Sequence, residues 1–322
     1  MAPTPPRSLL DAMRAEVVLL DGGLSTELDR LGYDVSSALW SARLLRDDTA
    51  AITAVHRSFF AAGAHVATTA TYQATFEGFA TIGIDRPQAE QLLVRSVRLA
   101  REAAAETGHE CWVAASIGPY GALLADGSEY TGAYADPAWA GRTSGGMTLG
   151  ELRAFHRPRL EALAAAGADV LACETIPAAV EAEALLAEVE AVGVPAWLSL
   201  TTTTDEHGQV RTRLGEPAEV VFALARDVDS VIAVSVNCVD PTHVGQAVRV
   251  AAAASGKPVV VYPNSGERWE ARRRRWVGTP GLPAPAVAGW IEAGARLVGG
   301  CCRIGPAELR AVADAVRANG SV

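Results

Sequence analysis

Glu292-Ala293-Gly294-Ala295 leads directly into the apolar stretch Arg296 to Gly299, which is followed by Gly300-Cys301-Cys302. An alanine-rich segment that ends in glycine is typical of a helix that stops in a left-handed residue. The same pattern recurs at Ala62-Gly63-Ala64 and at Ala166-Gly167-Ala168, in each case before another apolar run. This recurrence predicts a chain built from repeated helix and strand units.

Eight apolar runs are predicted to be strands, and each is followed by a helical pattern. The strands are Val17 to Leu20, His65 to Thr69, Trp112 to Ser116, Val170 to Cys173, Ala196 to Leu200, Val231 to Val236, Val259 to Tyr262 and Arg296 to Gly299. The helices are expected near 47–62, 86–106, 149–166, 178–191, 217–226, 243–254, 284–294 and 306–318. Near-continuous apolar strands indicate a parallel sheet that is buried on both faces. We therefore expect an α/β fold, a closed (β/α)8 TIM-like barrel with parallel strands, and keep an open doubly wound sheet as the alternative.

No linker or shift in composition divides the chain, so residues 1–322 are expected to form a single barrel domain. The segment 118–147 is irregular and rich in Gly, Ala, Tyr and Asp. Loops of this length inside a compact domain usually cover a binding site. We expect this segment to be a lid.

Composition excludes several classes of function. The net charge of -9 argues against a nucleic-acid partner, which would require a basic surface. The chain has neither an apolar leader at its N-terminus nor a run of about eighteen apolar residues, so no membrane partner is expected and the location is expected to be cytoplasmic. A reducing compartment would keep the five cysteines as thiols. The sequence gives no sign of the oligomeric state.

Three cysteines stand at the C-terminal ends of predicted strands. Cys238 follows the sixth strand, and the adjacent Cys301 and Cys302 follow the eighth. In a barrel of this kind these ends form one rim, where the chemistry gathers. Three thiolates can hold Zn²⁺ and leave a fourth tetrahedral position open, as in a catalytic site. The remaining cysteines, Cys111 and Cys173, lie in apolar runs and are interpreted as core residues.

Two acidic residues are expected on the same rim. Asp21 ends the first strand and Glu174 the fourth. Because three thiolates leave only the substrate's position open at the metal, these carboxylates are better suited to bind a substrate ammonium group. The amides of Gly22 and Gly23 are expected to receive a substrate carboxylate as a backbone nest. Together these features describe a site for an amino acid whose sulfur reaches the metal.

The motifs at the strand ends resemble those of the homocysteine S-methyltransferases, in order and over essentially the whole chain. They are Asp21-Gly22-Gly23-Leu24-Ser25-Thr26-Glu27-Leu28, Thr71-Tyr72-Gln73-Ala74, Ser116-Ile117-Gly118-Pro119-Tyr120-Gly121, Asp126-Gly127-Ser128-Glu129-Tyr130, Glu174-Thr175-Ile176-Pro177, Val236-Asn237-Cys238 and Gly299-Gly300-Cys301-Cys302. The Asn-Cys followed by Gly-Gly-Cys-Cys is the most specific part.

The resemblance implies an enzyme that transfers a methyl group to homocysteine and gives methionine, with zinc held by Cys238, Cys301 and Cys302. It implies that homocysteine is bound at Asp21, Gly22, Gly23, Glu174 and Asn237. It also suggests a binding site for the methyl donor, formed by Trp40, Tyr72, Gln73, Tyr120, Glu129 and Tyr130. Because no further domain for cobalamin or folate is present, the expected donor is a methylsulfonium, either S-methylmethionine or S-adenosylmethionine.

Several alternatives stay open at this point. The donor is betaine in related enzymes, and the acceptor can instead be selenocysteine or another thiol. A non-catalytic zinc- or thiol-binding protein is a third possibility. A Schiff-base aldolase is disfavoured because Lys257, the only lysine, precedes its strand and should lie on the opposite face of the barrel. A metal-dependent hydrolase would more naturally carry histidines after the first strand.

Overall fold

The computed structural model describes residues 7–35, 39–270, 275–280 and 284–320. Eight parallel strands form one sheet, and every predicted strand is present. They are β1 (Val18–Leu19), β2 (Val66–Thr68), β3 (Trp112–Ile117), β4 (Val170–Ile176), β5 (Ala196–Leu200), β8 (Val231–Asn237), β9 (Val259–Tyr262) and β12 (Ala295–Val298). β4 and β8 extend further than expected, so Glu174 and Asn237 lie within strands rather than after them.

The sheet closes into a barrel. Its strand order is β1-β12-β9-β8-β5-β4-β3-β2, which follows the chain around the ring. A parallel bridge between Leu20 and Val66 joins the first and last of these strands, with hydrogen bonds from His65 N to Leu19 O (2.7 Å) and from Asp21 N to Val66 O (3.0 Å). The predicted (β/α)8 barrel is therefore confirmed, and the open doubly wound alternative is excluded.

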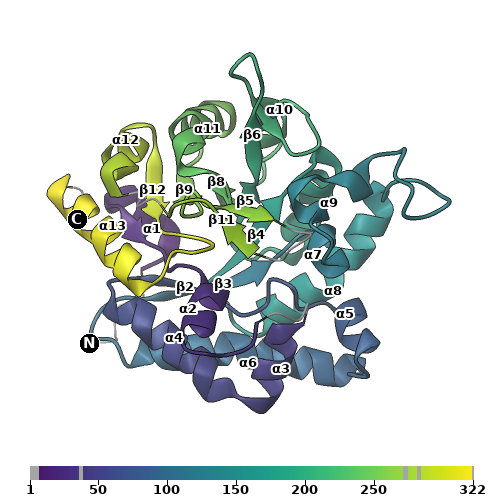
Figure 1. The fold of residues 1–322 in the computed structure, drawn as a ribbon, viewed down its shortest axis with the longest axis horizontal. Coiled ribbons are helices and arrows are strands. Elements are labelled where there is room, and N and C mark those ends of the chain that lie inside the picture. The colour runs from purple at the N-terminus through teal and green to yellow at the C-terminus, as the bar shows by residue number, and fades with distance from the viewer. Residues whose placement is uncertain (1–6, 36–38, 271–274, 281–283, 321–322) are drawn as a thin grey trace.

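Helices surround the strands in Figure 1. They are α1 (Leu9–Ala15), α2 (Leu24–Arg30), α3 (Trp40–Asp47), α4 (Thr49–Ala61), α5 (Phe76–Thr81), α6 (Arg86–Ala105), α7 (Tyr120–Leu124), α8 (Leu149–Ala165), α9 (Ala179–Val192), α10 (Ala218–Ala223), α11 (Pro241–Ser255), α12 (Val287–Glu292) and α13 (Pro306–Ala318). Local sequence sets several of their ends. Asp85 and Gln88 form a capping box at the start of α6, and Thr148 and Glu151 form another at α8. α1, α2, α3, α5 and α7 had not been predicted from the sequence.

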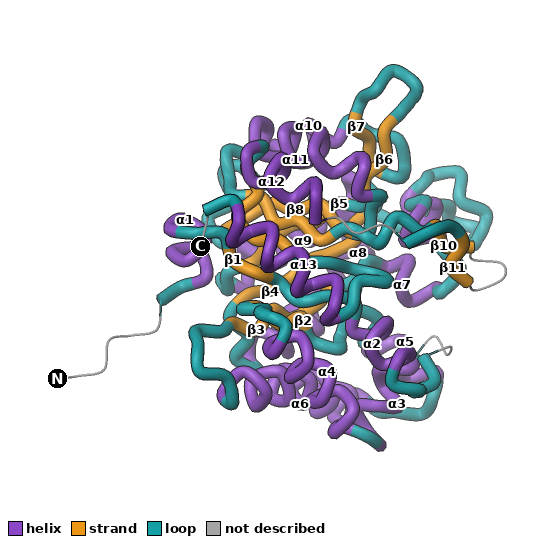
Figure 2. Tube along the Cα trace, turned by 60° about the vertical axis from the view of Figure 1, so that its left-hand side comes forward, coloured by secondary structure: helices purple, strands orange, loops and turns teal. Residues whose placement is uncertain are grey.

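Two hairpins follow barrel strands at their C-terminal ends, and they too had not been predicted. β6 (Thr202–Thr204) pairs with β7 (Val210–Thr212) after β5, and β10 (Arg268–Glu270) pairs with β11 (Arg275–Val277) after β9. Both project from the barrel in Figure 2. The segment 118–147 holds α7 and two short 3₁₀ helices, η1 (Ser128–Tyr130) and η2 (Ala133–Ala135). Three inserted segments thus surround the end of the barrel at which the candidate site residues lie.

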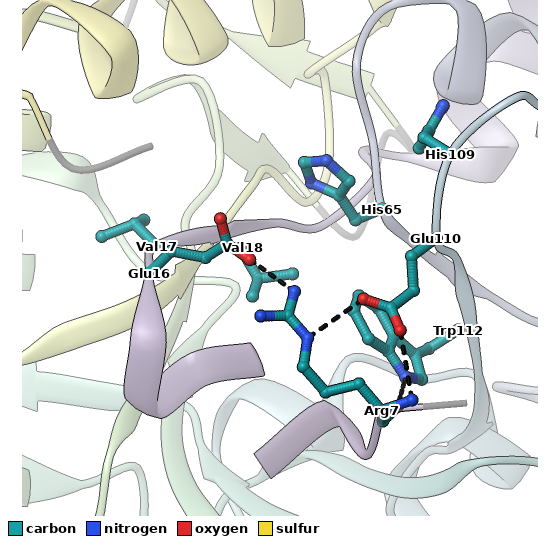
Figure 3. Close-up of a pocket in the computed structure, with 8 residues that line it drawn as sticks. All are labelled: Arg7, Glu16, Val17, Val18, His65, His109, Glu110 and Trp112. Carbon is teal, nitrogen blue, oxygen red and sulfur yellow. Dashed lines mark hydrogen bonds and ion pairs between the residues drawn. The ribbon is translucent and has the colours of Figure 1, made fainter. Parts of the chain in front are cut away.

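The opposite end of the barrel is closed by α1. Its side chains Leu9, Ala12 and Met13 pack inside the barrel with strand residues such as Trp112 and Leu297. Beside this plug is a pocket of about 90 Å³, drawn in Figure 3. There Arg7 lies between Glu16 and Glu110, at 2.5 Å and 3.1 Å. The pairs are half-exposed, so they should add little to stability, about 0–1 kcal/mol each.

Within the part of the chain that the structure describes, none of the helices has both the length and the apolar character that crossing a bilayer requires.

Candidate metal and substrate site

The three predicted metal ligands meet at the C-terminal end of the barrel. Cys238 follows β8, and Cys301 and Cys302 follow β12, on either side of β9. The sulfur atoms of Cys238 and Cys301 are 2.7 Å apart and those of Cys301 and Cys302 are 4.0 Å apart. All three sulfur atoms lie within 4.8 Å of one another, the only such group of potential ligands among the described residues.

Backbone packing brings these cysteines together. Added Cβ atoms on Gly299 and Gly300 would lie 2.6 Å from Asp21 O and 2.2 Å from the Ile304 side chain. Glycine at both positions therefore lets the loop after β12 pack against β1. Cys238 has a left-handed backbone with φ 51°, which turns the chain at the end of β8.

The donor set fits a thiophilic cation. With metal–sulfur bonds of about 2.3 Å, a tetrahedral zinc site has sulfur atoms about 3.8 Å apart. The Cys301–Cys302 separation matches this value, while Cys238 and Cys301 would have to move apart. Hydrogen bonds from Cys238 and Cys301 hold the pKa of the Cys302 thiol well below its usual value, and those with Cys238 and Cys302 raise the pKa of Cys301. The three cysteine side chains thus share protons through hydrogen bonds between their sulfur atoms. A cation that bound to the sulfur atoms would displace these protons.

Glu174 is buried beside the sulfur atoms. Its carboxylate accepts hydrogen bonds from the hydroxyls of Ser116 and Tyr262. Burial raises the pKa of Glu174 to about 7 despite these hydrogen bonds, and the charge of Cys238 raises it further. A carboxylate held in this way gains strongly from a cationic partner.

Asp21 is also buried, at 1% exposure. Its carboxylate accepts hydrogen bonds from the backbone N and the hydroxyl of Thr68 at 2.8 and 2.9 Å. Burial raises its pKa well above the usual value, and the charge of Glu174 acts in the same direction. The structure therefore brings both predicted acids within electrostatic reach of one another, and Asp21 also links β1 to β2.

The predicted glycine nest is only partly available in this conformation. Gly23 N donates to Ile304 O at 2.8 Å, so this amide is already occupied. A Cβ on Gly22 would lie 2.4 Å from Ile304 O, and one on Gly23 would lie 2.7 Å from Cys301 O. Both glycines therefore serve the close approach of the loop that carries Cys301.

Asn237 braces neighbouring strands. Its Oδ1 accepts from Thr175 N at 2.8 Å and from Ser199 Oγ at 2.6 Å, while its Nδ2 donates to Thr175 Oγ1 at 2.8 Å. Oδ1 therefore has no acceptor position left, and one Nδ2 hydrogen lacks a partner among the described residues. In this structure its role is to hold Thr175, whose φ is 62°, next to Glu174.

The residues predicted for the donor separate into two groups. Tyr130 is close enough to Cys302 to lower the pKa of that thiol, and the charge of Glu129 raises the pKa of Tyr72. Burial raises the pKa of Glu129 to about 7, and its Oε2 is buried without a hydrogen-bond partner. These three side chains therefore lie within electrostatic reach of the cysteine cluster.

The other three residues predicted for the donor site differ in what the structure shows of them. The ring of Tyr120 packs against Tyr134 and Phe155, with centroids 5.4 and 5.0 Å away, so it belongs to an aromatic cluster under the loop. Gln73 is half-buried next to Tyr72. Trp40 begins α3, and its side chain lies outside the described residues.

One charged residue near the site was missed. Arg213 follows β7, and its Nε donates to Thr201 Oγ1 at 3.2 Å. Thr201 Oγ1 in turn donates to Cys238 O at 3.3 Å. No sequence signal pointed to Arg213, because the hairpin that carries it is short and polar.

Comparison with known proteins gives consistent matches. The family model described as homocysteine S-methyltransferase matches residues 18–316. The chain is 42% identical over 317 residues to homocysteine S-methyltransferase 4 of Zea mays, covering 93% of this chain and 89% of that protein. It is 41% identical over 318 residues to homocysteine S-methyltransferase of Escherichia coli (strain K12), covering 96% and 97%.

Solved structures agree with this result. The homocysteine methyltransferase MmuM from Escherichia coli in its metallated form has a TM-score of 0.79 and 39% identity, covering 92% of this chain and 95% of that chain. A methyltransferase from Methanosarcina mazei, at 12% identity and a TM-score of 0.53, shares the fold.

Proposed function

Because the chain belongs to the homocysteine S-methyltransferase family and is an enzyme that methylates homocysteine, we propose that its donor is a methylsulfonium and its metal is zinc. The observation that carries this proposal is the meeting of three cysteine sulfurs and two buried carboxylates at one end of the barrel. The product is methionine, and the donor leaves as a neutral thioether.

Cys238, Cys301 and Cys302 would hold the zinc ion. When bound, zinc acts as a Lewis acid that lowers the pKa of the homocysteine thiol, so that the sulfur attacks as a thiolate. The thiol proton is released, a new carbon–sulfur bond forms, and the carbon–sulfur bond of the donor breaks. The chain's own residues bind and orient the two substrates, which needs little acid–base machinery.

Asp21 and Glu174 would bind the homocysteine ammonium group. Asp21 is fixed by Thr68, and Glu174 is fixed by Ser116 and Tyr262, so neither carboxylate has to be ordered when the substrate arrives. The ammonium group would give each buried carboxylate the positively charged partner that it lacks in the free enzyme.

The donor would bind on the side of Tyr72, Glu129 and Tyr130. Aromatic rings attract a sulfonium through a cation–π interaction of about 0.5–2 kcal/mol. The segment 118–147 carries Glu129 and Tyr130, so we propose that it acts as a lid which completes the donor site. A cytoplasmic location belongs to the same proposal, because oxidising conditions would join adjacent free cysteines.

A selenol acceptor is the second candidate, favoured by 38% identity over 314 residues with selenocysteine Se-methyltransferase of Brassica oleracea var. italica, covering 91% of this chain and 87% of that protein. Selenium and sulfur would use the same open metal position.

One assay tests metal, donor and acceptor together. Metal content is measured, and methionine formation from homocysteine is followed with S-methylmethionine, S-adenosylmethionine or betaine, with selenocysteine as the competing acceptor. We expect bound zinc and activity with a sulfonium donor, and loss of both in a folded Cys238→Ala variant. Activity with betaine alone would overturn the donor proposal. Bound zinc without methyl transfer from any donor would favour a non-catalytic protein.

A further inference from the structure

We propose that Arg213 and Glu129 together recognise the amino-acid head group of the methyl donor, Arg213 binding its α-carboxylate and Glu129 its α-ammonium. This inference rests on the proposed function and adds a specificity-determining residue, Arg213, that the family motifs in the sequence did not include. It predicts that the enzyme selects a sulfonium amino acid over a simple alkyl sulfonium.

Two hydrogen bonds fix the position of Arg213. Its side chain lies over the C-terminal ends of β5 and β8, because Nε is tied to Thr201 and Thr201 is tied to the carbonyl of Cys238. The neighbouring Leu214 is fixed as well, since its N donates to Pro177 O at 3.1 Å. A Cβ on Gly132, in the segment that carries Glu129, would lie 3.2 Å from the Cβ of Leu214. The hairpin and the proposed lid therefore pack together beside the sulfur atoms.

Among the described residues, only Nε of the Arg213 guanidinium has a hydrogen-bond partner, and no carboxylate forms an ion pair with Arg213. Burial lowers the pKa of Arg213, while the charges of Tyr130 and Cys238 raise it. A half-buried guanidinium without a counter-charge would repel a sulfonium cation. A donor that carries its own carboxylate removes this repulsion and matches the planar fork of the Nη groups.

Glu129 has a carboxylate oxygen without a hydrogen-bond partner among the described residues. Its Oε2 is buried and accepts no hydrogen bond, whereas buried carboxylate oxygens are normally satisfied. Glu129 and Arg213 do not form an ion pair with one another, although both are within electrostatic reach of Cys238. An ammonium and a carboxylate on one carbon would satisfy both residues at once. Asp21 and Glu174 offer only negative charge, so this pair is chemically distinct from the homocysteine site.

Three donors separate the contributions. S-Methylmethionine has both head-group charges, dimethylsulfoniopropionate has only the carboxylate, and trimethylsulfonium has neither. Steady-state kinetics of the zinc-loaded enzyme at saturating homocysteine are compared for wild type, Arg213→Met, Arg213→Lys and Glu129→Gln. Arg211→Met is the matched control, because Arg211 is on the same hairpin and pairs with Asp205 at 2.8 Å.

We expect Arg213→Met to lower kcat/KM about 10- to 100-fold for the two carboxylate donors, mainly through KM, as loss of a charge-assisted pair should. Trimethylsulfonium should change less than about twofold, and Arg213→Lys should recover part of the loss. Glu129→Gln should affect S-methylmethionine more than dimethylsulfoniopropionate. Arg211→Met should behave as wild type, with unchanged zinc content in all variants.

An equal loss for all three donors, or a rise in the KM for homocysteine instead of the donor, would overturn the inference while leaving the proposed function intact. If wild type transfers no methyl group from any sulfonium, the proposed function fails. Calorimetric binding of S-methylmethionine then decides the inference separately. Weaker binding to Arg213→Met than to wild type supports it, and equal or absent binding overturns it.

Discussion

At the scale of single residues, backbone strain is concentrated around the sulfur atoms. Four described residues other than glycine have a positive φ, and three of them, Thr175, Cys238 and Arg303, flank the metal and substrate site. Such conformations cost of order 1–3 kcal/mol each and persist where the surroundings determine them. Here Asn237 holds Thr175 through two hydrogen bonds and is itself held by a third from Ser199. The packing of the barrel thus compensates for the backbone strain that positions Glu174 and Cys238.

The carboxyl of Glu174 should govern both substrate affinity and stability. Glu174→Gln keeps the shape but removes the charge, so we expect the KM for homocysteine to rise about 10- to 100-fold with zinc content unchanged. In wild type, Glu174 is protonated below its pKa of about 7, so affinity for homocysteine should increase as the pH rises through that value. The pH dependence should weaken in the variant. A homocysteine KM that is the same in both proteins would contradict the ammonium role.

The raised pKa of Glu174 should also make the stability of the protein depend on pH. The folded pKa of about 7 exceeds the ordinary value of 4.5, so between these values the folded state binds more protons than the unfolded state. The free energy of unfolding should therefore fall as pH rises from about 4.5 to 7 and then level off, a loss of up to about 3 kcal/mol. In urea unfolding of the metal-free protein, Glu174→Gln should be more stable than wild type at pH 8 and similar at pH 5. Parallel pH curves for the two proteins would argue against a raised pKa.

At the scale of elements, the barrel strands could be predicted from the sequence, whereas the hairpins and short helices inserted between them could not. Barrel strands are apolar on both faces, so their pattern predicted all eight and placed the three cysteines on one end. The hairpin of β6 and β7 is built from short threonine-rich strands such as Thr202–Thr204, which lack that pattern. Arg213 was missed for this reason. Tyr120 was assigned by motif, but its ring packs under the loop, which only tertiary structure reveals.

The loop that carries Glu129 and Tyr130 is anchored on both sides of these two residues by one buried carboxylate. Glu181, on α9, accepts hydrogen bonds from Tyr120 N at 2.7 Å and from the hydroxyl of Tyr134. His156 Nε2 donates to the same carboxylate at 2.8 Å, because its Nδ1 accepts from Arg159 and arginine has no acceptor.

Removing one anchor should loosen this segment without disturbing the metal. Tyr134→Phe leaves Glu181 with one donor fewer, at a cost of about 1–3 kcal/mol. We expect faster amide hydrogen exchange in residues 120–135 and a higher KM for the donor than in wild type, with zinc content unchanged. Tyr33→Phe, outside the loop, is the control. Unchanged exchange in the loop would show that Glu181 does not hold it.

At the scale of the whole molecule, the two ends of the barrel have different roles. Cysteines, buried acids, hairpins and the proposed lid all gather where the strands end, as is usual for this fold. The other end holds α1, whose side chains fill the barrel, and the exposed ion pairs of Arg7 beside it (Figure 3). We therefore expect that end to contribute stability rather than chemistry.

Met13 tests this division. Its side chain is fully buried inside the barrel, so Met13→Ala removes packed atoms and leaves a cavity, at a cost of about 2–5 kcal/mol. Because the cavity lies at the start of the strands, the KM values for homocysteine and donor should stay within about twofold of wild type at a temperature where the variant is folded. Leu149→Ala is the control, since Leu149 is 39% exposed and its loss should change stability by less than about 0.5 kcal/mol. Urea unfolding gives the stability and steady-state kinetics the KM values. A change in either KM in fully folded Met13→Ala would show that α1 is coupled to the metal and substrate site through the barrel. The two ends of the barrel would then not have separate roles.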